Sequence, residues 1–483
     1  MSDSLKTKAT DGMLWSAIDR FLAQGSQVAF NVILARLLMP EDFGVIGMLS
    51  IFIVISQSFV DSGMGSGLIQ KKNRTDKDFS TVFIFNTTIS LFIYFILFFS
   101  APIIANFFER QELVFLTRIL GLNIIINSFA IVQRTILTIN LDFKTFAKIN
   151  TLSVIVSGIF AVALAYNDFG VWSLVIQNLL MASISVILFW SLSKWKLSLK
   201  FSFESFKQLF SYGSKLLIAS LYANSLSEIY NASIGKVYNA QSLGFYTNAK
   251  KFSDSASFTI TSVLQQVTFP ILSSLQDDKE RLISVYVRLI RITAFLIIPI
   301  MTLFALLADP LIRILLTDKW EAAIPLLQWL CIARIVTPIS ALNMNILNAV
   351  GRSDLFLKVD LSKLPIIIAA LVITIPLGIK AIVIGSVVTS LLSFFINAYM
   401  PGKLFGYGAF KQLKDMKKII IATLGMILLV FLTQKLVDQF LLKIMLGSFV
   451  GVSSYILFCS LMKMHEIKEI KSIFFSKIHS QLL

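Results

Sequence analysis

Histidine and cysteine are scarce in this chain of 483 residues, which contains two of each. Cys331 and Cys459 both lie in apolar stretches, so we expect buried thiols and assign neither a disulfide nor a metal site. The two histidines, His465 and His479, lie in the polar C-terminal segment. The sequence also lacks a Walker motif, and this argues against ATP as a direct driver of whatever the protein does.

Charged residues are few as well. They make up 14% of the chain, against 56% hydrophobic residues, and the mean hydropathy is +0.80. These values are too apolar for an ordinary soluble chain. Apolar stretches of roughly 20 residues, enough for a helix to cross a ~30 Å hydrocarbon core, recur along the whole length. The first of them is long enough to remain as a span, so we expect an integral membrane protein without a cleavable signal peptide.

The apolar stretches predict an all-α polytopic membrane protein with about fourteen transmembrane helices. Residues 1–200 contain the first six spans, residues 201–402 the next six, and residues 403–483 the last two together with a tail. The predicted spans are 12–38, 43–70, 79–105, 112–138, 144–166, 169–192, 205–236, 243–275, 281–308, 322–348, 355–376, 379–401, 417–436 and 440–462.

Lysine and arginine alternate between the two sides of this predicted bundle. The loops at 71–77, 144–148, 194–207 and 403–418 are rich in them, whereas most loops on the opposite side carry one or two. The positive-inside rule therefore places the basic loops and both chain ends in the cytoplasm. The net charge of +16 is spread over many short loops, so it does not indicate nucleic-acid binding. It is explained by membrane topology alone, with binding of anionic lipid headgroups as the alternative.

The two predicted halves show an internal repeat. NVILARLLMPEDFGV, which begins at Asn31, matches NASIGKVYNAQSLGF, which begins at Asn231, and Gly44 aligns with Gly244. Because six spans return the chain to its starting side, the two lobes would have the same orientation and be related by an axis along the membrane normal. Chance similarity between apolar helices is the alternative explanation.

Four segments carry a family resemblance: GMLWSAIDRFLAQGSQ, LARLLMPEDFGVIGM, LGFYTNAKKFSD and NAVGRSDLFLK. They resemble the polysaccharide-exporter branch of the MOP superfamily, which contains the Wzx-type oligosaccharide flippases, and are most similar to the colanic-acid type. The resemblance covers essentially the whole chain but does not specify a sugar. It implies two MATE-like six-helix lobes around a central cavity, with two additional helices.

The same resemblance implies a function and a cellular location. By alternating access, such a protein moves an oligosaccharide linked to undecaprenyl pyrophosphate from the inner to the outer leaflet of the bacterial cytoplasmic membrane. Its expected partners are this lipid-linked oligosaccharide, the membrane lipids and other polysaccharide assembly proteins. No cofactor and no catalytic step are implied, and coupling to H+ or Na+ is left open.

Cations inside spans are the first candidates for a substrate site. An ionisable residue there costs at least ~2.5–3.5 kcal/mol on insertion scales, so it usually faces a protein interior or water. We expect Arg20, Lys250, Lys251 and Arg334 to bind the pyrophosphate, by analogy with the cationic cavity of this family. The alternative is that these charges only hold helices together.

Polar and acidic residues in the same spans complete the candidate site. The amides expected to bind the sugar, with interhelical hydrogen bonding as an equal alternative, are Gln24, Gln57, Asn31, Asn224 and Asn231. The acids expected to couple an ion or to gate the transporter are Asp19, Asp61, Glu228 and Asp254. Asp61 is also the expected partner of Arg20 on a neighbouring helix.

Two further patterns predict local structure. GMGSGLIQ, residues 63–70, contains three alternating glycines, but it follows an apolar helix rather than a strand, which predicts a close-packed or flexible helix end and no nucleotide loop. Lys363 is expected to pair with Asp360, three residues earlier on the same helix.

Other functions are alternatives to the flippase. A multidrug or cation exporter of the MATE-type branch is the main one, but the surplus of intramembrane cations argues against it. A membrane polymerase or ligase would need a longer outer loop. A purely structural role in assembly stays open.

Overall fold

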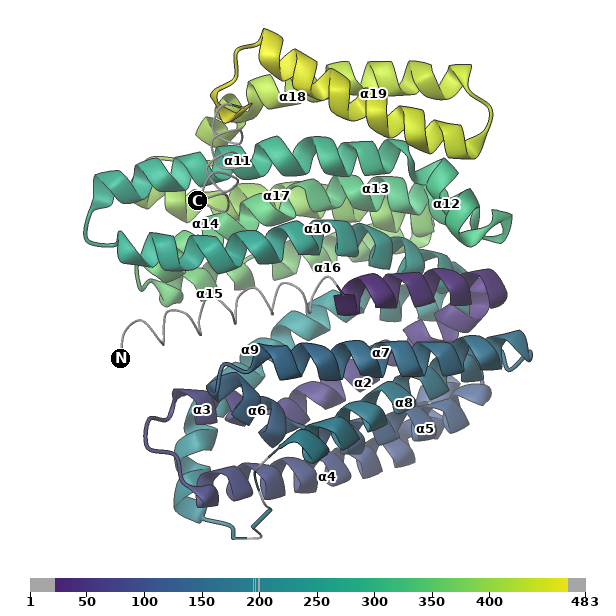
Figure 1. Cartoon of the computed structure of the whole chain (residues 1–483), viewed down its shortest axis with the longest axis vertical. Helices are drawn as coiled ribbons and strands as arrows, with labels where there is room; N and C mark the ends of the chain where they lie inside the picture. Colours follow the sequence, from purple (N-terminus) through teal and green to yellow (C-terminus); the bar gives the residue numbers. More distant parts are fainter. Residues whose placement is uncertain (1–21, 194, 196, 199, 468–483) are drawn as a thin grey trace, which may run out of the picture. The chain divides into compact units, whose positions relative to one another are not determined.

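The computed structural model describes residues 22–193, 195, 197–198 and 200–467, and in these ranges the chain is helical and contains no strand (Figure 1). Packing divides the chain into two compact units, Met1–Thr247 and Asn248–Leu483. The predicted all-α polytopic architecture is confirmed. The predicted lobe boundaries at residues 200 and 402 come from the predicted spans and the repeat. The two packing units are defined by contacts and do not test these boundaries, which therefore stay a prediction.

The first unit begins with a helix over residues 22–37. It then contains α2 (Pro40–Asp61), α3 (Met64–Gln70), α4 (Asp76–Phe108), α5 (Glu112–Ser128), α6 (Ile131–Ile139), α7 (Phe143–Tyr166), α8 (Val171–Leu192), α9 (Phe203–Val237) and the start of α10 (Ala240–Ser274). Polar caps in the loops define several of these starts. Before α4, for example, the Thr75 backbone N–H donates to Asp78 Oδ2 at 2.8 Å.

The second unit continues α10 and ends with a helical hairpin, α18 (Ala409–Leu436) and α19 (Phe440–Leu461), in which α18 packs beside α11 (Figure 1). The elements between α10 and this hairpin are α11 (Lys279–Leu306), α12 (Ala308–Leu316), η1 (Asp318–Trp320), α13 (Ala323–Ile335), α14 (Thr337–Ala349), α15 (Ser353–Leu361), α16 (Leu364–Thr374), η2 (Ile375–Leu377) and α17 (Ile379–Phe405).

Ten helical stretches among the described residues are long and apolar enough to cross a membrane, so the predicted total of fourteen is not confirmed. Predicted span 12–38 begins outside the described residues. α9 and α10 have 35 residues each, but their many Ser, Asn and Thr residues lower the hydropathy. The predicted span 355–376 is divided into α15, α16 and η2, which are individually short.

The predicted second span, 43–70, is broken into α2 and α3. Ser62 and Gly63 between them have φ values of 40° and 67°, in the left-handed region that ends a helix. A Cβ at Gly63 would lie 2.6 Å from the Gly213 carbonyl oxygen of α9, so this break packs directly on another backbone. A Cβ at Gly65 would lie 3.0 Å from Thr135 Oγ1 of α6. The GMGSGLIQ segment is therefore close-packed, as predicted, but it begins at a break in the span.

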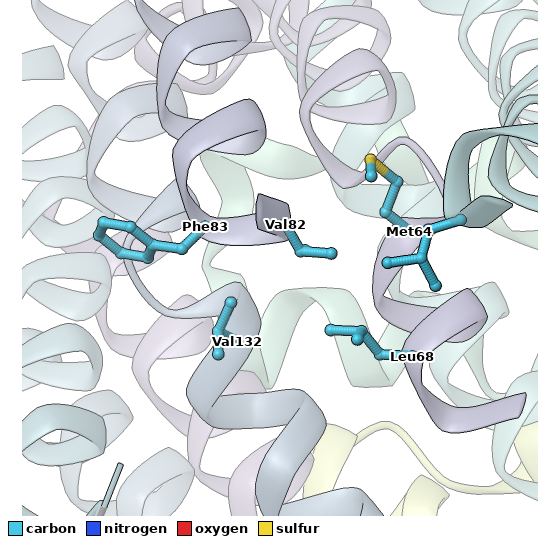
Figure 2. Close-up of a cluster of buried hydrophobic side chains, with 6 residues drawn as sticks. Met64, Leu68, Val82, Phe83 and Val132 are labelled. Atoms are coloured by element: carbon cyan, nitrogen blue, oxygen red, sulfur yellow. The ribbon is translucent and has the colours of Figure 1, made fainter. Parts of the chain in front are cut away.

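A buried apolar cluster fixes the position of α3 and α6. Met64 and Leu68 of α3 meet Val82 of α4 and Val132 of α6 in this cluster (Figure 2), and Leu209 of α9 also belongs to it. Each of these five side chains is at most 2% exposed. Close-packed apolar side chains resist displacement, so the short helix α6 is held rigidly against the break in the second span.

Two glycines related by the internal repeat pack in a reciprocal way within the first unit. A Cβ at Gly44 would lie 1.6 Å from the Ala240 carbonyl oxygen, and a Cβ at Gly244 would lie 1.7 Å from the Pro40 carbonyl oxygen. Pro40 and Ala240 are themselves two hundred positions apart. The matching contacts show that the first turns of α2 and α10 cross with a local twofold relation, which no larger residue would permit.

Candidate functional site

Asp61, the last residue of α2, lies directly before the break in the second predicted span. Its side chain is exposed, and its carboxylate Oδ1 accepts a hydrogen bond of 3.1 Å from Gln57 Nε2, one turn earlier. The structure therefore brings together two of the predicted site residues. Arg20, the predicted partner of Asp61, and the neighbouring Asp19 lie outside the described residues.

Arg134 of α6 is the cation that the structure places near Asp61, and the two side chains interact electrostatically. The Arg134 guanidinium lies over the Phe189 ring of α8, 5.3 Å from its centroid. Its Nε is buried and has no hydrogen-bond acceptor. A charged group that is partly buried in a span is costly, and a cation–π contact contributes about 0.5–2 kcal/mol. The aromatic contact therefore offsets part of the cost.

Sequence reasoning did not include Arg134 among the site residues. It lies close to the predicted end of span 112–138, a position at which a cation commonly reaches the membrane surface. One available signal was its local sequence, IVQRTILTI, which contains no acid within one helical turn that would neutralise the charge.

A second polar group joins α2 to α9. Glu228 Oε2 accepts hydrogen bonds from Ser50 Oγ at 2.5 Å and from Asn231 Nδ2 at 2.7 Å. One turn away along α9, Asn224 Nδ2 donates to Ser58 Oγ at 2.8 Å. Asn231 Nδ2 also donates to Ser50 Oγ of α2 at 3.3 Å. Asn224 and Asn231 thus make the interhelical bonds that were one of the two expectations for them. The Glu228 end of this group lies apart from Asp61, because Ser50 is eleven residues, or about 16 Å of helix, before it. Ser58 at the other end is within one turn of Asp61 on α2.

In the second unit, Arg334 of α13 pairs with Asp254 of α10. The distance from Arg334 Nε to Asp254 Oδ1 is 2.5 Å, and the side chains are 27% and 39% exposed. Such partial exposure leaves the pair accessible to water or to another ion. Lys250 and Lys251 precede Asp254 on α10, where the Lys251 side chain is exposed.

Other charges in the second unit are held in local pairs. Lys363 Nζ lies 2.6 Å from Asp360 Oδ1, which confirms the predicted pair. Arg291 of α11 donates to Asp415 of α18 at 2.7 Å. The two remaining amides named above, Gln24 and Asn31, lie on the helix over residues 22–37 and are partly buried.

A buried hydrogen-bond network ties α18 to α11 and α14. Gln412 Nε2 donates to Asn343 Oδ1 at 2.9 Å, and Gln412 Oε1 accepts from Asn343 Nδ2 at 3.2 Å. The Tyr286 hydroxyl donates to Asn343 Oδ1. Gln412, Asn343 and Tyr286 are all 0% exposed. A network that is closed in this way is structural, because its polar atoms are used within the protein.

The chemistry available in the described residues is binding by charge and hydrogen bonds. Among them, no group of three or more His, Cys, Asp or Glu side chains is arranged to hold a metal ion. What the spans do contain is a set of partly accessible arginine, lysine and carboxylate groups, which suits an anionic ligand with a polar portion.

Comparisons with known proteins identify the family and similar folds. A family described as polysaccharide biosynthesis protein matches residues 33–325. The chain is 27% identical, over 355 residues and 73% of both chains, to the teichuronic acid biosynthesis protein TuaB of Bacillus subtilis. It is 21% identical, over 400 residues and 81% of both chains, to the lipopolysaccharide biosynthesis protein WzxC of Escherichia coli.

The fold resembles that of solved membrane transporters. A structure of the lipid II flippase MurJ in an inward closed conformation matches with a TM-score of 0.76 at 18% identity, over 93% of this chain and 98% of that one. An inward-facing MATE multidrug transporter matches with a TM-score of 0.63 at 17% identity, over 81% of this chain and 100% of that one. With the family match covering more than half of its length, the chain belongs to the polysaccharide biosynthesis protein family.

Proposed function

We propose that this protein is a flippase that moves a polyprenyl-pyrophosphate-linked oligosaccharide from the inner to the outer leaflet of the bacterial cytoplasmic membrane, for surface polysaccharide biosynthesis. Family membership carries the proposal, because relatives along most of the chain are named for teichuronic acid and lipopolysaccharide biosynthesis. The similarity in fold to a lipid II flippase agrees with a lipid-linked substrate. Both chain ends are cytoplasmic in this proposal, and the two six-helix lobes, 1–200 and 201–402, alternate in access.

The cations in the spans bind the substrate headgroup. In this proposal Arg334, Lys250, Lys251 and Arg20 attract the pyrophosphate, whose charge interacts more strongly with them in the poorly screened interior than in water. The pairing of Arg334 with Asp254 supports an exchange mechanism, in which a phosphate oxygen replaces the carboxylate. The amides of Gln24, Gln57, Asn31, Asn224 and Asn231 then serve the sugar.

The acids in the spans supply coupling. Asp19, Asp61, Glu228 and Asp254 are the groups that would take up H+ or Na+ as the protein changes conformation. We propose that no catalytic step takes place, since the family and the similar folds are transporters. A drug exporter site should instead be rich in acids and aromatics, and the excess of arginine and lysine disfavours that function.

The proposal is tested by following a fluorescent undecaprenyl-pyrophosphate glycan between the leaflets of proteoliposomes. We expect the wild-type protein to flip this lipid and Arg334→Ala to flip it roughly 10–100-fold more slowly, because a hydrogen bond to a charged group contributes about 1.5–3 kcal/mol. Arg291→Ala is the matched control, since Arg291 is held by Asp415 and lies outside the proposed site.

Each outcome of this assay decides a separate point. A folded wild-type protein that leaves the glycolipid in its original leaflet contradicts the proposed function. Wild-type flipping that Arg334→Ala leaves unchanged contradicts the role of Arg334 alone. Flipping that persists after both the H+ and the Na+ gradients have been collapsed contradicts ion coupling.

A further inference from the structure

Arg134 differs from Arg118, another arginine of the first unit whose guanidinium lies over an aromatic ring. Arg118 of α5 lies over the Phe98 ring, 4.2 Å from its centroid, and its Nε donates to the Phe98 carbonyl oxygen at 3.4 Å. Arg134 has the ring contact with Phe189 but no hydrogen bond from its guanidinium to any described residue, and its Nε is buried. Of these two similar arginines, Arg134 has its donors unused.

Asp61 and Arg134 attract each other electrostatically, but no direct hydrogen bond joins their described side chains. Asp61 Oδ1 accepts its hydrogen bond from Gln57, and Arg134 Nε has no hydrogen-bond partner among the described residues. The Asp61 carboxylate is exposed. The arrangement therefore leaves a partly buried cation, whose buried Nε lacks an acceptor, near a carboxylate that is accessible to solvent.

Packing around Arg134 fixes its position and leaves its guanidinium N–H donors available to a ligand. Val132, two residues before it, is fixed in the apolar cluster of α3, α4, α6 and α9 (Figure 2). The buried Phe189 ring supports the guanidinium, which keeps its coplanar N–H donors for an acceptor. A planar fork of N–H groups matches the spacing of two oxygens of a phosphate group.

We propose that Arg134 binds a phosphate group of the substrate's pyrophosphate, and that Asp61 is the counterion it interacts with when no substrate is present. The inference rests on the proposed function for the identity of the anion. It assigns a headgroup contact to α6 of the first unit. When the phosphate binds, it provides Arg134 with the acceptor that the protein lacks, and it repels the Asp61 carboxylate.

A binding assay tests this contact without any transport. Inorganic pyrophosphate is titrated into the full-length protein in phosphatidylcholine nanodiscs, and binding is followed by calorimetry. We expect Arg134→Gln to weaken binding at least about tenfold, and Arg134→Lys to weaken it less because the charge is kept. Asp61→Asn should strengthen binding severalfold, because it removes the competing carboxylate. In the double variant Arg134→Gln with Asp61→Asn, that gain should disappear.

Arg118→Gln is the matched control, and it should bind pyrophosphate like the wild type. The proposal is overturned if Arg134→Gln binds as tightly as the control, or if Asp61→Asn fails to strengthen binding in a protein that elutes as a single folded species. The interdependence of the two substitutions distinguishes a binding role from a structural one, because a merely misfolded variant would not abolish the gain selectively.

A second arm separates the two sources of phosphate. The titration is repeated in nanodiscs that contain phosphatidylglycerol. Unchanged affinity supports a site for the soluble pyrophosphate group, whereas loss of the Arg134-dependent binding assigns the site to an anionic lipid headgroup and overturns the proposal. Since neither arm measures flipping, a protein that binds pyrophosphate through Arg134 but fails to move the glycolipid would contradict the proposed function and leave the binding site standing.

Discussion

Gly44→Ala will destabilise the first unit by at least the upper part of the ~1–3 kcal/mol range that is typical of overpacked interiors. The added Cβ would lie 1.6 Å from the Ala240 carbonyl oxygen and 2.4 Å from its carbon. Both are backbone atoms at the start of α10, so no side-chain rotation relieves the overlap, and a whole helix has to shift. Gly244→Ala, whose Cβ would meet the Pro40 carbonyl oxygen, should have an effect of the same size.

Thermal unfolding of the detergent-solubilised protein, followed by size-exclusion chromatography with fluorescence detection, measures this effect. Gly25→Ala is the matched control, since Gly25 is also a helical glycine and the Cβ that alanine adds there would meet no neighbouring group within 4 Å. Alanine favours a helix by roughly 0.5–1 kcal/mol over glycine, so this control should melt at or slightly above the wild-type temperature. If Gly44→Ala melts together with Gly25→Ala, the helix crossing is not as close as described.

Gln412→Leu will loosen α18 from the second unit. The substitution leaves Asn343 Nδ2 without its acceptor and the Tyr407 carbonyl oxygen without its donor, which lay 3.2 Å away in each case. Each group left unsatisfied costs about 1–3 kcal/mol, so the loss should be roughly 2–6 kcal/mol. Leucine has nearly the volume of glutamine, and the effect therefore comes from the lost bonds rather than from a cavity.

The same melting assay, together with limited proteolysis at residues 406–408 before α18, measures the loss. Gln434→Leu on the same helix is the control, because it removes one hydrogen bond of 2.8 Å to the Leu306 carbonyl oxygen at a partly buried position. We expect a smaller change in melting temperature and no new cleavage before α18. Equal melting of the two variants would show that the Gln412 network contributes no more than a single bond.

Much of the fold was predictable from sequence because the bilayer restricts the options. A span has to satisfy its backbone hydrogen bonds internally, so a run of apolar residues in a polytopic chain predicts a helix. The repeat was also visible, through Gly44 and Gly244, because a close helix crossing admits only the smallest residue. The break at Ser62 and Gly63 was not located, since it depends on how closely Gly213 of α9 approaches, and that residue is far away in the chain.

The candidate site was predictable by residue type but not by partner. Asp254 and Arg334 were both identified, yet their pairing joins helices that are 80 positions apart and depends on how α10 packs against α13. Lys363 and Asp360 were paired correctly because a three-residue spacing fixes their geometry within one helix. Arg134 was missed, since only the tertiary structure shows that its guanidinium lies over the buried Phe189 ring.

The polarity of α9 has a consequence for how the protein enters the membrane during its synthesis. Ten helical stretches among the described residues are long and apolar enough to partition into the bilayer on composition alone. Helix α9 is not one of them. Its Asn224 and Glu228 find their hydrogen-bond partners on α2, in Ser58 and Ser50. Because α2 precedes α9 in the chain, those hydroxyls are already in place when α9 leaves the ribosome. Insertion of the later helix is therefore coupled to the earlier one, and α9 expressed without α2 should stay out of the bilayer.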